Sequence, residues 1–184
     1  MTEKFFQFEK WYAKNLAHRP AGERIIWLES EIDKIEEFWT KKCIFLNLYT
    51  SNLEIAQFER ALDVKEREIQ FDPNDALAFI TKAELLLYLM DKPEEALETI
   101  ERGISLSVET KRFRRHALAV KARIALRLEN YTLLDEVLVS ISELKLEKGA
   151  EDVGREADFF DKADKSKLSS EVVSKYEAYL AEKR

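Results

Sequence analysis

The stretch DPNDALAFITKAELLLYLMDKPEEALETIERGISL, residues 72–106, decides the fold of this chain. Its apolar residues recur every three or four positions on both sides of Asp91-Lys92-Pro93, which predicts two helices joined by a tight turn. Asp72-Pro73-Asn74-Asp75 is typical of a helix start, because Asp and Asn cap free N–H groups and Pro is tolerated where no donor is needed. Pro93-Glu94-Glu95 is a second start, with carboxylates near the positive end of the helix dipole. The stretch therefore predicts a helical hairpin.

The composition of the whole chain agrees with this hairpin. The chain has 184 residues, of which only 4 are Gly and 3 are Pro, while 46% are hydrophobic and 36% are charged. Sheets and Gly-rich loops need turn residues, so this scarcity favours long helices with short connections. We expect one all-α domain over residues 1–184. The expected helices cover residues 3–17, 21–39, 38–50, 53–71, 74–90, 93–106, 110–129, 131–147, part of 150–164, and 168–182.

A second stretch, FRRHALAVKARIALRLENYTLLDEVLVSISEL at residues 113–144, lines up with the first. Each stretch has an alanine in the middle of its first helix, Ala83 and Ala122. Each has a small or apolar residue in its second helix, Ala96 and Leu134, which follow 13 and 12 positions later. Small residues at these positions let the two helices approach closely, and the same holds for Gly103. The chain is therefore predicted to contain a helical repeat.

At these residues the sequence resembles the tetratricopeptide repeat family. Residues 72–79 are similar to the family's D-P-N-x-A-x-A-W junction, with Phe79 in the aromatic position, and residues 94–97 are similar to its E-E-A-I start. In the next unit Ala122, Tyr131 and Leu144 match, but Leu134 replaces the usual Ala. Lys82 also departs from the pattern, because that position is usually apolar, and the spacing from Ala83 to Ala122 is 39 residues where the family has 34.

The resemblance implies a short right-handed array of two to three stacked antiparallel hairpins. The hairpin core would cover residues 56–144, with N-terminal helices at 1–50 and C-terminal capping helices at 150–184. Extra terminal helices make physical sense, because end repeats must cover their open apolar faces. The alternative is an irregular helical bundle that shares the hairpin chemistry by convergence.

Catalytic and metal-binding motifs were sought, and we identify no catalytic residue, metal ligand or cofactor. The sequence has no P-loop, no G-x-G-x-x-G, no H-E-x-x-H and no C-x-x-C. His18 and His116 lie far apart, and the single cysteine, Cys43, sits in an apolar run that predicts a buried thiol. No apolar segment is long enough to span a membrane, and the N-terminus lacks the features of a signal peptide, so we expect a cytoplasmic protein.

One helix departs from the acidic background. The net charge is -6, yet residues 109–130 hold seven basic and two acidic residues. On helical geometry the basic helix at 111–127 places Arg112, His116, Arg123 and Arg127 on one side, and the resemblance puts that side in a concave groove. Arginine there can hold a carboxylate through two parallel hydrogen bonds. The alternative is that the basic helix only balances the acidic helices of residues 72–108.

A second candidate surface is the aromatic N-terminus. Its aromatic residues exceed one helix stripe, and they either cap the next two helices or form a surface for self-association or a partner. They are Phe5, Phe6, Phe8, Trp11 and Tyr12.

The sequence thus predicts a non-enzymatic adaptor or scaffold that binds a partner peptide or helix in a helical groove. Self-association is a further expectation for this class of surface. Arg112, His116, Arg123 and Arg127 would orient an acidic segment of the partner, and Tyr88 would supply contact area. One alternative is a helical enzyme or ligand-binding subunit with a closed pocket. Another is nucleic-acid binding through the basic helix at 111–127, which the overall acidity opposes.

Overall fold

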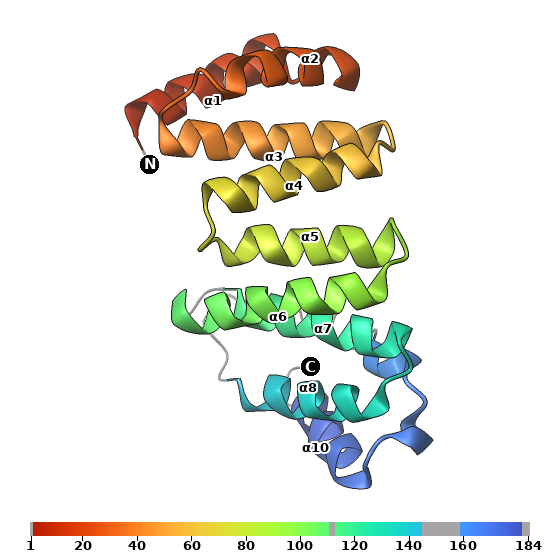
Figure 1. The fold of residues 1–184 in the computed structure, drawn as a ribbon. Helices are drawn as coiled ribbons and strands as arrows, with labels where there is room; N and C mark the ends of the chain where they lie inside the picture. The colour runs from red at the N-terminus through yellow and green to blue at the C-terminus, as the bar shows by residue number, and fades with distance from the viewer. Residues whose placement is uncertain (1, 111–112, 145–158, 182–184) are drawn as a thin grey trace. The chain divides into compact units, whose positions relative to one another are not determined.

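The computed structural model describes residues 2–110, 113–144 and 159–181, and its regular structure in these ranges is entirely helical (Figure 1). The expectation of an all-α chain is confirmed. The chain divides into two compact units, Met1–Ala78 (unit 1) and Phe79–Arg184 (unit 2), and the single domain over residues 1–184 stays a prediction.

Unit 1 is built around one central helix. It contains α1 (Glu3–Asn15), α2 (Ala21–Ile32), α3 (Phe38–Glu54) and α4 (Phe58–Phe71). Helix α3 packs against α1, α2 and α4. The shared core includes Leu28, Ile44 and Leu48, whose side chains are fully buried. Helix α3 is therefore the helix that the other three share.

Unit 2 continues the hairpin pattern. Helix α5 (Ala76–Tyr88) begins just before the unit boundary and is followed by α6 (Pro93–Thr110), α7 (Arg114–Arg127) and α8 (Tyr131–Glu143). After a helical turn at residues 159–162 and a 3₁₀ turn (Lys165–Lys167), α10 (Ser170–Ala181) packs against α8. The expected short helix in 150–164 lies largely outside the described residues.

The small residues of the repeat lie where the sequence predicts close helix contacts. Ala83, Ala96 and Ala122 are fully buried, and Leu134 is 1% exposed. A Cβ atom added to Gly103 of α6 would lie 3.2 Å from Ile80 Cγ1 of α5, which is tighter than ordinary van der Waals contact. Gly103 is therefore the residue that permits this approach of α5 and α6.

Three hairpin turns share one backbone signature. Ala56, Asp91 and Glu129 have φ angles of 53°, 53° and 51°, in the left-handed region. Each of these residues stands two positions before the second helix of its hairpin, which begins at Phe58, Pro93 and Tyr131. The α3–α4 hairpin thus closes in the same way as the two hairpins recognised from the sequence.

The expected helix at 21–39 is wrong in its second half. Helix α2 ends at Ile32 and α3 begins at Phe38, so Ile35 and Trp39 do not continue the stripe of Ile32. The break follows from Glu37, whose Oε2 accepts hydrogen bonds from the backbone N–H and the hydroxyl of Thr40, both at 2.6 Å. These donors lower the pKa of Glu37 to about 2. Glu37 is the N-cap of α3. The sequence did not predict it, because the preferred N-cap residues are Ser, Thr, Asp and Asn.

The expected break at Thr50-Ser51-Asn52 is also wrong, because α3 runs through these residues to Glu54. The Asn52 side-chain amide donates to the Leu48 carbonyl at 2.8 Å, and the Thr50 hydroxyl lies 3.1 Å from the Leu46 carbonyl. Residues that favour turns are tolerated inside a helix when their polar groups bond back to the preceding turn. Here burial of Ser51 and Asn52 against neighbouring helices overrides their local preference.

Candidate interaction surfaces

The predicted basic stripe lies on α7, and two of its members contact carboxylates within unit 2. His116 Nε2 lies 3.0 Å from Glu84 Oε1 of α5. Arg127 donates from Nη2 and Nε to Asp91 Oδ1, at 2.6 and 3.1 Å. The Arg127–Asp91 pair is open to water, with side chains 59% and 70% exposed. Arg112 lies outside the described residues.

Arg123 and Tyr88 come together between the other two pairs. A hydrogen bond and electrostatic contact join Arg123 to the Tyr88 hydroxyl, and desolvation of that hydroxyl raises the pKa of Tyr88 although Arg123 acts in the opposite direction. Tyr88 as a whole is 52% exposed. The Arg123 guanidinium also lies 5.8 Å from the Phe159 ring centre. A hydrophobic residue near the C-terminus therefore supports this arginine, which spacing along α7 alone does not reveal.

A further cation of α7 pairs with the acidic helices. Lys121 Nζ lies 2.6 Å from Glu101 Oε1 of α6. With the His116 and Arg127 pairs, this contact fits the charge-balance interpretation of the basic helix. The Arg127–Asp91 pair is exposed, and exposed pairs contribute little stability, so a partner's carboxylate can compete with Asp91 for Arg127. The two interpretations of the basic helix are therefore compatible.

The aromatic residues of α1 divide into two groups. Phe5 and Tyr12 are buried, at 8% and 7% exposure, whereas Phe6 and Trp11 are 48% and 41% exposed. Trp11 stacks on Trp27 of α2 with ring centres 4.6 Å apart. Most of this aromatic surface therefore packs within unit 1, as expected for a cap, and a part of it stays accessible.

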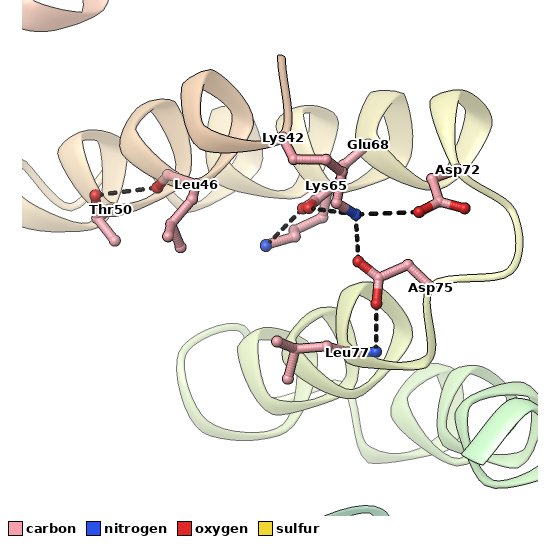
Figure 2. A network of polar contacts seen from close by, with 8 residues as sticks. All are labelled: Lys42, Leu46, Thr50, Lys65, Glu68, Asp72, Asp75 and Leu77. Atoms are coloured by element: carbon pink, nitrogen blue, oxygen red, sulfur yellow. Dashed lines mark hydrogen bonds and ion pairs between the residues drawn. The ribbon is translucent and has the colours of Figure 1, made fainter. Parts of the chain in front are cut away.

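A charged network in unit 1 was not predicted from the sequence. Figure 2 shows the ammonium group of Lys42 on α3 facing three carboxylates, those of Glu68, Asp72 and Asp75. Lys42 Nζ lies 3.1 Å from Glu68 and 3.6 Å from Asp72, and it also contacts Asp75 directly. Lys65 Nζ lies 2.7 Å from the second oxygen of Glu68. We call these five residues the Lys42 network.

Three members of the Lys42 network are shielded from water, while the side chains of Asp72 and Asp75 are 23% and 20% exposed. The side chains of Lys42, Glu68 and Lys65 are 14%, 7% and 4% exposed. Burial opposes the charged form of Lys42, but hydrogen bonds and attraction from Asp75 and Glu68 outweigh it, so the net effect raises the pKa of Lys42. Asp75 Oδ1 also accepts the backbone N–H of Leu77 at 2.9 Å, at the start of α5. Lys42 thus connects α3, the end of α4 and the cap of the next helix.

Sequence reasoning missed this network for a clear reason. Lysine and glutamate on amphipathic helices are usually solvated, and Lys42 lies 26 positions from Glu68 with no pattern that links them. The available signal was the Asp72-Pro73-Asn74-Asp75 junction, which places two carboxylates in one tight connection. Cys43, beside Lys42, is half-buried, and burial raises the pKa of its thiol to about 11, with the charge of Glu9 acting in the same direction.

Within the described ranges, no group of three or more His, Cys, Asp or Glu side chains is arranged to hold a metal ion. None of the helices in those ranges has the length and apolar character needed to cross a bilayer.

The stacked hairpins, buried alanines and shared turn signature define a tetratricopeptide-like helical repeat. The fold is shown by two solved structures that match nearly the whole chain. One is described as a MamA RS-1 ArsTM double mutant, with 14% identity, a TM-score of 0.64 and coverage of 100% of this chain and 98% of its own. The other is a Podosopora anserina putative kinesin light chain with nearly identical TPR-like repeats, with 12% identity, a TM-score of 0.60 and coverage of 98% and 95%.

Sequence comparisons add nothing to this structural likeness, since no family model and no curated protein matches the chain. The resemblance identified at residues 72–106 is thus confirmed for the fold.

Proposed function

We propose that the chain is a non-enzymatic interaction module that binds an acidic segment of a partner protein along α7. The observation that carries this proposal is the row of contacts between α5 and α7 in unit 2. Three side chains of α7, His116, Arg123 and Arg127, reach the α5 side at Glu84, Tyr88 and Asp91. Cations and a half-exposed aromatic ring are therefore side by side, which suits a peptide with both carboxylates and apolar residues.

The binding step would be an exchange of ion-pair partners. A carboxylate of the incoming segment would replace Asp91 at Arg127, where both side chains are already mostly exposed. The exchange costs little, because an exposed ion pair contributes little stability. Arg123 is held by Tyr88 and by the Phe159 ring, so its guanidinium is oriented before the partner arrives. Orientation in advance lowers the entropy cost of binding.

Charge reversal tests this proposal. The probe is a fluorescein-labelled 12-residue peptide of alternating Glu and Leu, followed by fluorescence anisotropy, and the test variant is Arg123→Glu with Arg127→Glu. The matched control is Lys167→Glu with Lys175→Glu, which changes the net charge equally at the C-terminal end of unit 2. We expect at least a tenfold loss of affinity in the test variant alone, with an unchanged circular dichroism spectrum. Equal affinity of the two variants would refute the proposal.

A further inference from the structure

The solvent side of α3 carries an apolar row with heptad spacing. Trp39, Cys43, Leu46, Thr50 and Leu53 follow one another at alternating intervals of four and three residues. This spacing places side chains along one side of a helix, and it is the pattern by which one helix packs against another. Trp39 and Leu46 are 42% and 53% exposed. We call this row the α3 seam.

The α3 seam lies opposite the core of unit 1. Ile44 and Leu48, which flank Leu46 at two positions on either side, are fully buried. Two residues correspond to about 200° around a helix, so Leu46 points away from that core. Since α1, α2 and α4 pack on the other sides of α3, the seam is a regular apolar row that these three helices leave accessible.

The polar atoms within the seam are already satisfied. The Thr50 hydroxyl is hydrogen-bonded to the Leu46 carbonyl of its own helix, as Figure 2 shows. The Asn47 amide beside the seam donates to the Cys43 carbonyl at 2.8 Å and to its sulfur at 3.3 Å. A partner that covers the seam with apolar side chains would therefore leave no unpaired hydroxyl or amide behind, which removes the main cost of such burial.

The surroundings of the seam are acidic. On one edge Lys42 faces Glu68, Asp72 and Asp75, so its positive charge is more than matched. On the other edge the charge of Glu9 acts on Cys43.

Other charges near α3 leave this excess in place. Glu54, at the end of α3, pairs with the buried Arg24 but is itself 54% exposed. Lys65 pairs with Glu68, and Lys41 lies away from the seam, over the Phe71 ring at 5.3 Å. Carboxylates thus outnumber cations along both edges, which favours a positively charged partner.

We propose that the α3 seam docks a basic amphipathic helix of a partner protein. The partner would insert apolar residues between Trp39, Leu46 and Leu53 and place Lys or Arg toward the Lys42 network and Glu9. α3 has 17 residues, about 25 Å at 1.5 Å per residue, so the complementary helix needs four to five turns. This surface belongs to unit 1 and goes beyond the acidic-segment site on α7, so either proposal can fail alone.

Two synthetic 18-residue helices test this proposal on the full chain by isothermal titration calorimetry. Both carry Leu at heptad positions, and one is flanked by Lys while the other is flanked by Glu. The test variants are Leu46→Glu and Thr50→Glu, and the matched control is Ile26→Glu on α2, where the side chain is 74% exposed. Each of the three variants introduces one carboxylate in place of an exposed side chain. The helices should stay intact, so we expect an unchanged circular dichroism spectrum.

We expect the Lys-flanked helix to bind the unsubstituted chain and Ile26→Glu equally, and to bind both α3 variants at least tenfold more weakly. The added carboxylate attracts a basic peptide, so a loss can arise only from blocked apolar docking. The proposal is overturned if the α3 variants bind the Lys-flanked helix as tightly as Ile26→Glu does. It is equally overturned if the unsubstituted chain binds the Glu-flanked helix as tightly as the Lys-flanked one. It is also overturned if sedimentation shows a dimer that Leu46→Glu dissociates, since a second copy would then occupy the seam.

Discussion

The Lys42 network of unit 1 and the Arg127–Asp91 pair of unit 2 use the same chemistry in opposite environments. Lys42 and Glu68 have side chains 14% and 7% exposed, whereas Arg127 and Asp91 are 59% and 70% exposed. A buried charge without its partner is strongly destabilising, while an exposed pair is close to neutral. The difference indicates that the Lys42 network holds helices of unit 1 together, whereas the Arg127–Asp91 pair contributes little to the stability of unit 2.

The largest expected effect follows from Lys42→Ala. It leaves Glu68, Asp72 and Asp75 facing one another with only Lys65 nearby, so we expect unit 1 to lose about 3–5 kcal/mol of unfolding free energy. Trp11, Trp27 and Trp39 are the only tryptophans of the chain, so fluorescence during urea unfolding reports on unit 1 alone.

The matched control for that experiment is Arg67→Ala. Arg67 pairs with Glu29 through two nitrogens at 3.0–3.1 Å, but the pair is 31% and 41% exposed. We expect a loss of about 1 kcal/mol or less. If the two variants lose similar amounts, burial of the Lys42 network does not determine its contribution, and the contrast between the units disappears.

A smaller effect is expected from alkaline pH. The carboxylates raise the pKa of Lys42 in the folded state, so its stabilising charge is fully present below the unfolded pKa of about 10.4 and is lost as pH rises through the folded value. Arginine keeps its charge throughout this range, so the Arg127–Asp91 pair persists.

The measurement is the difference in unfolding free energy between the unsubstituted chain and Lys42→Ala, from fluorescence at several pH values. We expect it to be constant between pH 7 and 9 and to shrink above about pH 10.5. Burial also raises the pKa of Tyr12 in unit 1. Because Tyr12 is present in both proteins, its contribution to the pH dependence cancels in this difference. A difference that grows with pH would contradict the assigned role of Lys42.

The sequence predicted the elements whose signals are local, and it missed those that depend on distant contacts. Pro93 begins α6 as expected, and Asn130 caps α8 by accepting the Leu133 N–H at 3.0 Å. The break at Glu37 was missed because a glutamate cap depends on geometry, and the continuity of α3 through Ser51 was missed because burial overrides turn preference.

The candidate sites follow the same rule. Helical spacing alone placed His116, Arg123 and Arg127 on one side of α7, but their partners Glu84 and Asp91 come from another helix and turn. The Lys42 network joins α3, α4 and the following connection, and no single segment contains its pattern. The α3 seam was hidden by the predicted break at residues 50–52, because its heptad spacing exists only if α3 continues through them.

The smallest expected effect is the coupling between Arg127 and Asp91. A double-mutant cycle with Arg127→Ala, Asp91→Ala and both together should give the weak coupling of an exposed ion pair, measured by thermal unfolding with circular dichroism. The coupling should decline further at about 1 M salt, because exposed charges are screened there. A coupling as strong as that of a buried ion pair would mean that Asp91 holds Arg127 too firmly for a partner's carboxylate to displace it. The exchange step proposed for unit 2 would then fail, and the difference between the two units with it.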